Sequence, residues 1–453
     1  MLMKATECKH GGSRQLGLGL ELKLTILAMI VTIGATAPGC ATADTAETVQ
    51  ASADWLGWLG PKRDGWVSGF KPPSPWPESL KNGWQLEVGT GYATPLVVYG
   101  TGGKGGRVYQ HARQGEDEVL WCLDLETGGV KWRKTYAVPF KMGQSGEFHG
   151  KGPKSCPMLA DGKIFTMSIA GTLSAWDAKS GEFLWRNNYG SRFKDTRPYW
   201  GHAASPIVDG KRVFFHFGTD DEGALVALDV DTGKEVWTQG TDGPSYSSPL
   251  VVEISGVRQV VQWNHEDLVG VDIDSGRLLW EFLFPHVGSD QNMPTPTFHE
   301  GRVLLGGENR GLHSVVPQLK DGGWTVGSRW HNEDVALDMS SAVINGDLLY
   351  GMSHYGKGRY FCLDPQTGKV LWQGPGRTGD NVTFLSIPGY VVALVDTGKL
   401  EVIAARGDKF EKVASYRVSD KPTWAPPVLV NGGVLVKDTD TLTFWSLVDP
   451  GKG

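Results

Sequence analysis

Residues 124–132 read Asp-Leu-Glu-Thr-Gly-Gly-Val-Lys-Trp, and the pattern within them, Asp-x-x-Thr/Ser-Gly-x-x-x-Trp, occurs five times in the chain. The copies are Asp124–Trp132, Asp177–Trp185, Asp229–Trp237, Asp272–Trp280 and Asp364–Trp372. The Asp can accept hydrogen bonds from backbone N–H groups just ahead of it, and the Gly can take the positive φ of a tight turn. The pattern therefore predicts a hairpin turn leading into a strand that carries Trp, repeated along the chain.

Many repeats also have a recognisable beginning, in which Ser or Thr followed by Pro, or a similar pair, precedes a short apolar strand. The pairs that fill this slot are Thr94-Pro95, Cys156-Pro157, Ser205-Pro206, Ser248-Pro249, Thr295-Pro296 and Ala425-Pro426. A second strand often follows an Asp-Gly turn, as at Asp161-Gly162 and Asp209-Gly210. These are hairpin signals, so each repeat is predicted to form four short antiparallel strands, A to D, with the Trp on strand D.

The D strands can be counted along the chain by their aromatic residue. They carry Trp84, Trp132, Trp185, Trp237, Trp280, Trp330, Trp372 and, in a worn copy, Tyr416. We expect these rings to pack between units, because a single small sheet cannot bury them. After Tyr416 the chain holds three more strands but no fourth, whereas the strand of Trp84 has no unit of its own.

Joining these two ends completes an eighth sheet and leaves no free edge. We therefore predict an all-β fold: a single eight-bladed β-propeller over residues 55–449, with four antiparallel strands per blade, closed by pairing of the N-terminal strand with the C-terminal blade. At 40% hydrophobic and 21% charged residues, the composition is that of a chain with a large core rather than a disordered one. The formal net charge is −6 and no basic block stands out, so nucleic acid is not an expected partner.

Residues 1–39 have the features of a signal peptide, with basic residues ahead of an apolar run at Leu24–Ala37. Ala37-Pro38-Gly39-Cys40 resembles a bacterial lipobox, which predicts lipidation of Cys40 and membrane attachment through that anchor only. The alternatives are ordinary cleavage after Ala41-Thr42-Ala43, or an anchor that is never cleaved. We predict an exported protein of the periplasm or outer membrane, otherwise a secreted soluble one, with a flexible linker at 40–54 and a tail at 450–453.

The repeat resembles the pyrroloquinoline-quinone (PQQ) type of β-propeller repeat, with its Ala-x-Asp-x-x-Thr-Gly-x-x-x-Trp docking motif. The lead-in Trp58-x-x-Pro61-x-Arg63-Asp64-Gly65 is similar to exported members that lack known catalysis. The resemblance implies one of two roles. One is a quinoprotein alcohol or sugar dehydrogenase, with PQQ and Ca²⁺ over the central channel. The other is a cofactor-free scaffold, such as the lipoprotein of the outer-membrane β-barrel assembly machine.

The sequence favours the cofactor-free role. It has no adjacent cysteine pair of the kind found in many such dehydrogenases, and the insertions that cover their cofactor are absent or short. Cys122 and Cys362 stand two residues before the motif Asp, where the other copies have Ala or Gly, so we interpret them as small buried side chains. No catalytic residue and no metal-ligand set is predicted.

Candidate ligand-binding residues come from one face of the propeller, where D-to-A connectors and B-to-C turns meet. They are His149, Tyr199, Trp200, His202, Tyr246, Asn292, Asp338 and Trp424 in connectors, with Arg310 and His354 in B-to-C turns. A funnel rim of aromatic and polar groups suits a ligand or an extended peptide. The expected partner is an envelope protein or peptide, or a small molecule or glycan, bound to a monomer or to a subunit of a complex.

Overall fold

The computed structural model describes residues 53–101, 105–142, 146–191, 200–219, 222–288 and 291–448. The predicted signal peptide, Cys40, most of the predicted linker, Tyr199 and the tail at 450–453 lie outside these residues. Within the described part of the chain, no helix is both long enough and apolar enough to cross a membrane.

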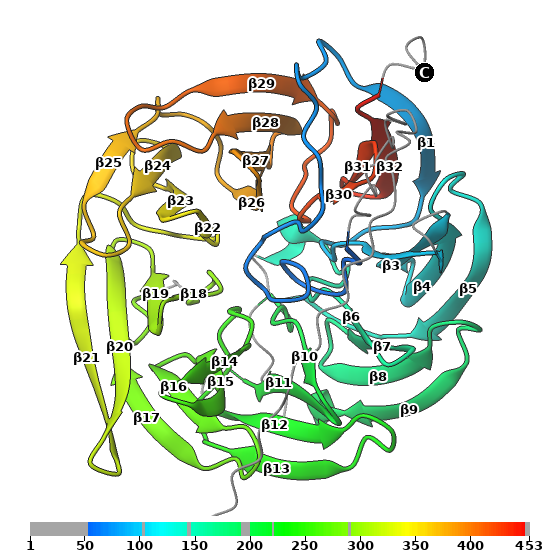
Figure 1. Ribbon diagram of the computed structural model, residues 1–453. Helices are drawn as coiled ribbons and strands as arrows, with labels where there is room; N and C mark the ends of the chain where they lie inside the picture. Colours follow the sequence, from blue (N-terminus) through cyan, green and yellow to red (C-terminus); the bar gives the residue numbers. More distant parts are fainter. Residues whose placement is uncertain are drawn as a thin grey trace, which may run out of the picture. The chain divides into compact units, whose positions relative to one another are not determined.

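The strands form eight four-stranded antiparallel sheets, arranged as the blades of a ring (Figure 1). Blades 1 and 2 comprise β2 (Leu96–Tyr99), β3 (Gly106–Gln114), β4 (Asp117–Asp124), β5 (Val130–Ala137), and β6 (Met158–Ala160), β7 (Lys163–Met167), β8 (Thr172–Asp177), β9 (Phe183–Asn188). Blades 3 and 4 comprise β10 (Ile207–Asp209), β11 (Arg212–Gly218), β12 (Gly223–Asp229), β13 (Glu235–Gln239), and β14 (Leu250–Ile254), β15 (Val257–Trp263), β16 (Asp267–Asp272), β17 (Leu278–Leu283).

Blades 5 and 6 comprise β18 (Thr297–His299), β19 (Arg302–Gly306), β20 (Leu312–Lys320), β21 (Gly323–Asn332), and β22 (Val343–Asn345), β23 (Leu348–Ser353), β24 (Arg359–Leu363), β25 (Val370–Gln373). Blade 7 comprises β26 (Val382–Ile387), β27 (Tyr390–Val395), β28 (Lys399–Ala404) and β29 (Lys412–Arg417). Blade 8 comprises β30 (Val428–Val430), β31 (Gly433–Lys437), β32 (Thr441–Ser446) and β1 (Lys81–Glu87). Among the described residues, the short 3-10 helices η2 (Gly146–His149) and η3 (Tyr189–Ser191) lie in connectors.

The predicted closure of the ring is confirmed. Strand β1 pairs antiparallel with β32, with Trp84 opposite Phe444 and Leu86 opposite Leu442. The first and last strands of the propeller therefore share blade 8, and each blade has the predicted four strands.

At five of the eight blade interfaces, the repeated Trp packs against the motif glycine of the next blade. In blade 2, the indole Nε1 of Trp185 donates to the backbone oxygen of Val230 in blade 3 at 3.0 Å. Gly233, the motif glycine of blade 3, has φ +68°, and a Cβ there would lie 2.6 Å from the Trp185 ring. Only glycine fits this contact without displacing the ring. The same pairs form between Trp84 and Gly128, Trp132 and Gly181, Trp237 and Gly276, and Trp330 and Gly368.

A belt of hydrogen bonds joins the inner strands, and it explains the Ser/Thr-Pro slot. In this slot the side chain accepts from the backbone N–H of the corresponding residue one blade earlier. The bonds run from Thr94 N to Cys156 Sγ, Cys156 N to Ser205 Oγ, Ser205 N to Ser248 Oγ, Ser248 N to Thr295 Oγ1 and Thr295 N to Ser341 Oγ, at 2.9–3.3 Å. They link six consecutive blades around the channel.

The lead-in at residues 53–70 crosses the middle of the ring (Figure 1). The residues that it contacts by hydrogen bonds include Val97, Tyr99, Leu159, Ser205, Pro206, Pro249, Thr295 and Ser386. These residues belong to the inner strands, or to the connectors leading into them, of six different blades. One side chain makes three of these bonds: the buried guanidinium of Arg63 donates to the carbonyls of Ser205, Pro206 and Pro249. The channel is therefore plugged by the protein's own chain.

Candidate functional site

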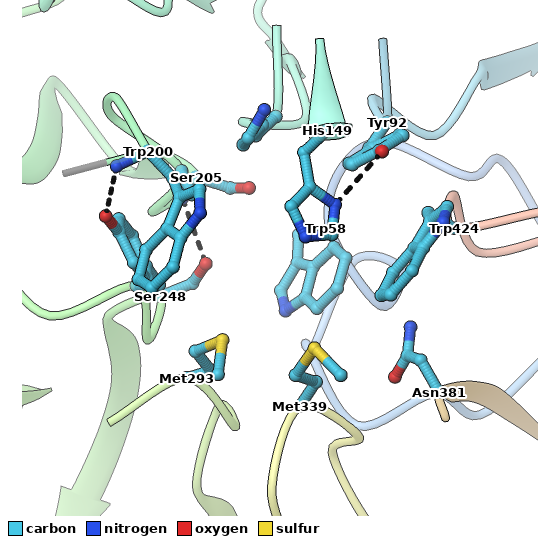
Figure 2. Close-up of a pocket in the computed structure, with 13 residues that line it drawn as sticks. Trp58, Tyr92, His149, Trp200, Ser205, Ser248, Met293, Met339, Asn381 and Trp424 are labelled. Atoms are coloured by element: carbon cyan, nitrogen blue, oxygen red, sulfur yellow. Dashed lines mark hydrogen bonds between the residues drawn. The ribbon is translucent and has the colours of Figure 1, made fainter. Parts of the chain in front are cut away.

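Next to the lead-in, which contributes Trp58 to its lining, lies a pocket of about 200 Å³, here called the funnel pocket. Its lining residues are Trp58, Tyr92, His149, Lys154, Trp200, Ala203, Ser205, Tyr246, Ser248, Met293, Met339, Asn381 and Trp424. All eight connectors that lead from an outer strand into the next inner strand contribute at least one of them, and Trp58 comes from the lead-in. The pocket is thus a property of the closed ring rather than of any one blade (Figure 2).

Two aromatic pairs form facing parts of the pocket wall (Figure 2). Tyr92 and Trp424 stack with ring centroids 5.6 Å apart, and His149 meets the Trp424 ring edge-on at 5.2 Å. The Tyr92 hydroxyl lies 3.3 Å from His149 Nδ1, which fixes the imidazole. On the other side, Trp200 and Tyr246 meet edge-on at 5.9 Å, and the Trp200 backbone N–H donates to the Tyr246 hydroxyl.

The polar groups of the pocket are few. Lys154 Nζ donates to the backbone oxygen of Gly150 at 3.1 Å and lies 5.1 Å from the centre of the Tyr92 ring. Burial lowers the pKa of this ammonium to about 8. Burial, together with the charge on Lys154, also lowers the pKa of His149. Ser205 and Ser248 belong to the belt, and Asn381 adds an amide.

The structure describes nine of the ten predicted ligand-binding residues, and they fall into three groups. His149, Trp200, Tyr246 and Trp424 line the funnel pocket. Asp338 and His354 line an adjoining depression of about 320 Å³, whose wall also includes His149 and Trp424.

The other three, His202, Asn292 and Arg310, line neither the funnel pocket nor the adjoining depression. The His202 ring is buried against Gly171. Buried Asn292 donates to the backbone oxygens of Asn264 and His265, and its amide oxygen accepts from Arg310. These side chains hold connectors in place. Tyr199, as noted above, is not described.

The prediction includes four residues of the pocket lining and misses the others, although the sequence contains a signal for several of them. Six lining residues stand two positions before the slot residue of their repeat. They are Tyr92, Lys154, Ala203, Tyr246, Met293 and Met339. Side chains two residues apart on extended chain point to the same side, so the slot residue and its second predecessor both face the channel. Trp58 has no such signal, because the lead-in is outside the repeat.

The funnel pocket does not supply the ligands that a quinone–calcium centre requires. That centre needs carboxylate and amide oxygens around the ion, whereas the described lining residues include one amide, Asn381, and no Asp or Glu. Asp338 and Asp380 line the adjoining depression instead. The residues present therefore do not fit this group.

A second cluster of side chains, outside the funnel pocket, has residue types that can bind a metal ion. His265, Glu266 and His286 in blade 4 have ligand atoms within 4.8 Å of one another. The two imidazoles, however, stack in parallel, with centroids 3.7 Å apart and an interplanar angle of 8°. An ion bound by both nitrogens must lie near both ring planes, and parallel planes at this separation do not allow it. This arrangement is not a preformed metal centre.

Eight blades in a closed ring, five of which carry the Asp-x-x-Thr/Ser-Gly-x-x-x-Trp motif, define a β-propeller of the PQQ-like type. Residues 115–374 match the family described as outer membrane protein assembly factor BamB, and the chain belongs to this family.

The proteins that are similar in sequence to this chain include assembly factors and dehydrogenases. Outer membrane protein assembly factor BamB of Shewanella oneidensis is 24% identical over 257 residues, covering 53% of this chain and 60% of the relative. The 1-butanol dehydrogenase (cytochrome c) of Thauera butanivorans is 25% identical over 313 residues, covering 64% of this chain and 42% of that enzyme. The chain thus spans less than two thirds of the length of either protein.

Among solved structures, BamB from Moraxella catarrhalis superposes with a TM-score of 0.56 at 16% identity, over 81% of this chain and 97% of that protein. At this identity the likeness concerns the fold alone.

Proposed function

We propose that the protein is a non-catalytic binding module of the cell envelope, exported and lipid-anchored through Cys40, which holds part of an envelope partner in its funnel pocket. Membership of the BamB family supports a role in a protein assembly. The name of the Shewanella relative, an outer membrane protein assembly factor, supports the outer membrane as the place.

The observation that carries the proposal is the convergence of all eight connectors on one aromatic pocket. Trp and Tyr are the residues in which binding energy concentrates at protein interfaces, where they line desolvated pockets that receive an anchor from the partner. Phe148, at 86% exposure, lies on the rim next to His149 and extends this apolar surface toward solvent.

Co-purification from native membranes in detergent tests the proposal. Wild-type protein should retain a defined outer-membrane partner, and the double variant Trp200→Ala/Trp424→Ala should lose it because the pocket wall is gone. Phe183→Ala, an exposed residue on outer strand β9, is the matched control and should behave as wild type. Retention by a double variant that still unfolds in one cooperative transition would remove the funnel pocket from consideration.

Cys40→Ser tests the anchor separately. The variant should move from the membrane fraction to the soluble fraction, because no lipid can be attached. An unchanged distribution would favour ordinary cleavage after Ala43 or an uncleaved anchor.

A quinone-dependent oxidoreductase is the second candidate, favoured by the 313-residue similarity to 1-butanol dehydrogenase (cytochrome c). Adding PQQ and Ca²⁺ to the purified protein discriminates between the two functions. A stoichiometric absorbance change with dye reduction by alcohols or sugars would establish the enzyme. On the binding proposal neither is expected, since the pocket lacks carboxylates for the ion.

A further inference from the structure

The funnel pocket contains a cation, Lys154, that no acidic side chain of the described residues neutralises. Among the described residues, no carboxylate lies within ion-pair distance of Lys154 Nζ, whose one protein hydrogen bond goes to the Gly150 carbonyl. By contrast, Lys151 in the same connector pairs with Glu116 at 3.6 Å. A half-buried ammonium without a counter-ion is poorly compensated, and an anion that enters the pocket can supply the missing charge.

The other polar groups in the pocket also favour a hydrogen-bond acceptor. The oxygens of Ser205 and Ser248 already accept the N–H groups of the belt, which leaves their hydroxyl hydrogens to donate. The amide oxygen of Asn381 accepts from Ser340, which leaves its NH₂ group to donate, and its side chain is directed into the pocket (Figure 2). Ser205, Ser248, Asn381 and Lys154 can therefore each donate a hydrogen bond to a ligand.

The remaining surface is apolar. Trp58, Tyr92, Trp200, Tyr246 and Trp424 present aromatic rings, and Met293 with Met339 adds flexible apolar surface. A compact ring or apolar group can pack against these walls, whereas a strongly hydrated ion alone would leave them uncovered.

We propose that the funnel pocket binds a carboxylate carried on a compact aromatic or apolar body, with the aromatic walls holding the body and Lys154 acting as counter-ion. The inference rests on the proposed binding function and names the ligand chemistry of the same site. This chemistry occurs in free aromatic acids and at the carboxyl terminus of a polypeptide that ends in an apolar residue.

Calorimetric titration with three ligands of one shape tests the charge preference. 3-Phenylpropionate should bind with a Kd of about 1 mM or tighter, a range typical of ligands of this size. The uncharged 3-phenylpropionamide should bind about tenfold or more weakly, because a hydrogen bond to a charged group is lost. Phenethylamine, a cation, should bind more weakly still.

Lys154→Met should remove the preference for acid over amide while leaving the apolar walls in place. Lys151→Met is the matched control, since Lys151 lies in the same connector but outside the pocket, and it should keep the preference. Lys154→Gln serves as the second variant if the Met variant does not fold.

A peptide ending in Phe, with its carboxyl group free or amidated, distinguishes the sources. Tighter binding of the free-acid peptide than of 3-phenylpropionate would assign the ligand to a polypeptide end, and weaker binding would assign it to a free acid. Equal affinity of wild type for acid and amide, or no binding of any ligand, would overturn the carboxylate inference. The binding function itself would fall only if the Trp200→Ala/Trp424→Ala variant kept its partner.

Discussion

At the start of the inner strands of blades 2 to 6, one side-chain atom accepts a hydrogen bond from the preceding blade, and Cys156 shows which property of that side chain matters. Its sulfur occupies the position that a Ser or Thr hydroxyl holds in the following blades, and it accepts a hydrogen bond from the Thr94 N–H at 3.1 Å. Burial raises the pKa of the Cys156 thiol to about 12, so it stays protonated at neutral pH. Its role is that of a buried acceptor rather than a reactive thiol.

Replacing Cys156 separates these roles. Cys156→Ser keeps an acceptor of similar size and should change the free energy of unfolding by less than about 1 kcal/mol. Cys156→Ala leaves the buried Thr94 N–H without a partner and should cost about 1–3 kcal/mol. Urea denaturation followed by tryptophan fluorescence measures both. Equal stability of the Ala and Ser variants would show that the belt contributes nothing at this blade.

The motif Asp makes the fold sensitive to acid. The Asp229 carboxylate accepts from the Thr232 hydroxyl and from the backbone N–H groups of Thr232 and Asp231, and these bonds lower its pKa. The backbone and side-chain bonds of Ser180 lower the pKa of Asp177 in the same way. A carboxyl whose pKa is lower in the folded state stabilises above its unfolded pKa of about 3.9, and this stabilisation is lost as the pH falls through the folded pKa.

Thermal unfolding between pH 6 and pH 3 should therefore show a falling midpoint, with the steepest loss below about pH 4. Asp229→Asn should lie below wild type at pH 6 and approach it at pH 3, because only the charge is removed. The exposed Asp420→Asn should follow the wild-type curve throughout. Parallel curves for Asp229→Asn and wild type would contradict the assignment.

Repeat spacing identifies some individual pocket residues, whereas His149, Trp200 and Trp424 were predicted from residue type and connector alone. The slot and its second predecessor share a face, so Tyr246 could be assigned to the channel from spacing alone. Spacing could not separate Trp200 from His202, which stand two apart in an irregular connector, yet one lines the pocket and the other is buried against Gly171. The long connector has no period to follow, and its path depends on contacts with other blades.

At the scale of elements, an outer-strand Trp and the glycine turn of the next blade should contribute to the free energy of unfolding in a coupled way. Trp185→Ala removes a buried ring and should cost about 3–5 kcal/mol. Gly233→Ala adds a Cβ 2.6 Å from that ring at φ +68° and should cost more than Gly210→Ala, at φ +54° with no atom within 4 Å. In the Trp185→Ala background the Gly233→Ala penalty should shrink toward that of the Gly210 control. An unchanged penalty in this double-mutant cycle would show that ring and turn do not couple.

The elements themselves followed from local chemistry, including the weak ones. Trp330 lies on an outer strand as predicted, in the second strand of the extended β20–β21 hairpin. That blade lacks the Asp-x-x-Thr-Gly turn, and Trp280 of the preceding blade accordingly bonds Gln259 Oε1 at 2.6 Å within its own sheet. A missing motif thus changes the docking partner of the neighbouring ring without removing the blade.

At the scale of the whole molecule, closure of the ring was predictable and the plug was not. The two incomplete ends of the repeat array complement each other in strand number, and β1 pairs with β32 as that count requires. The lead-in carries no repeat and no alternating pattern, so nothing local indicates that it lies in the channel. Its position depends on acceptors such as the Pro249 and Pro206 carbonyls, which the closed ring brings around it.

The plug should contribute to the stability of the ring as a whole. Arg63→Gln leaves buried carbonyls of two blades without their charged donor and should lower the free energy of unfolding by about 2–4 kcal/mol. Because the lead-in bonds six blades, this loss should shift the single unfolding transition of the propeller rather than add an early local one. The neighbouring exposed Lys62→Gln should leave the midpoint unchanged. Arg63→Gln could instead give a separate step at low denaturant, with the main transition at its wild-type midpoint. That result would show that the lead-in unfolds independently and that the ring is stable without it.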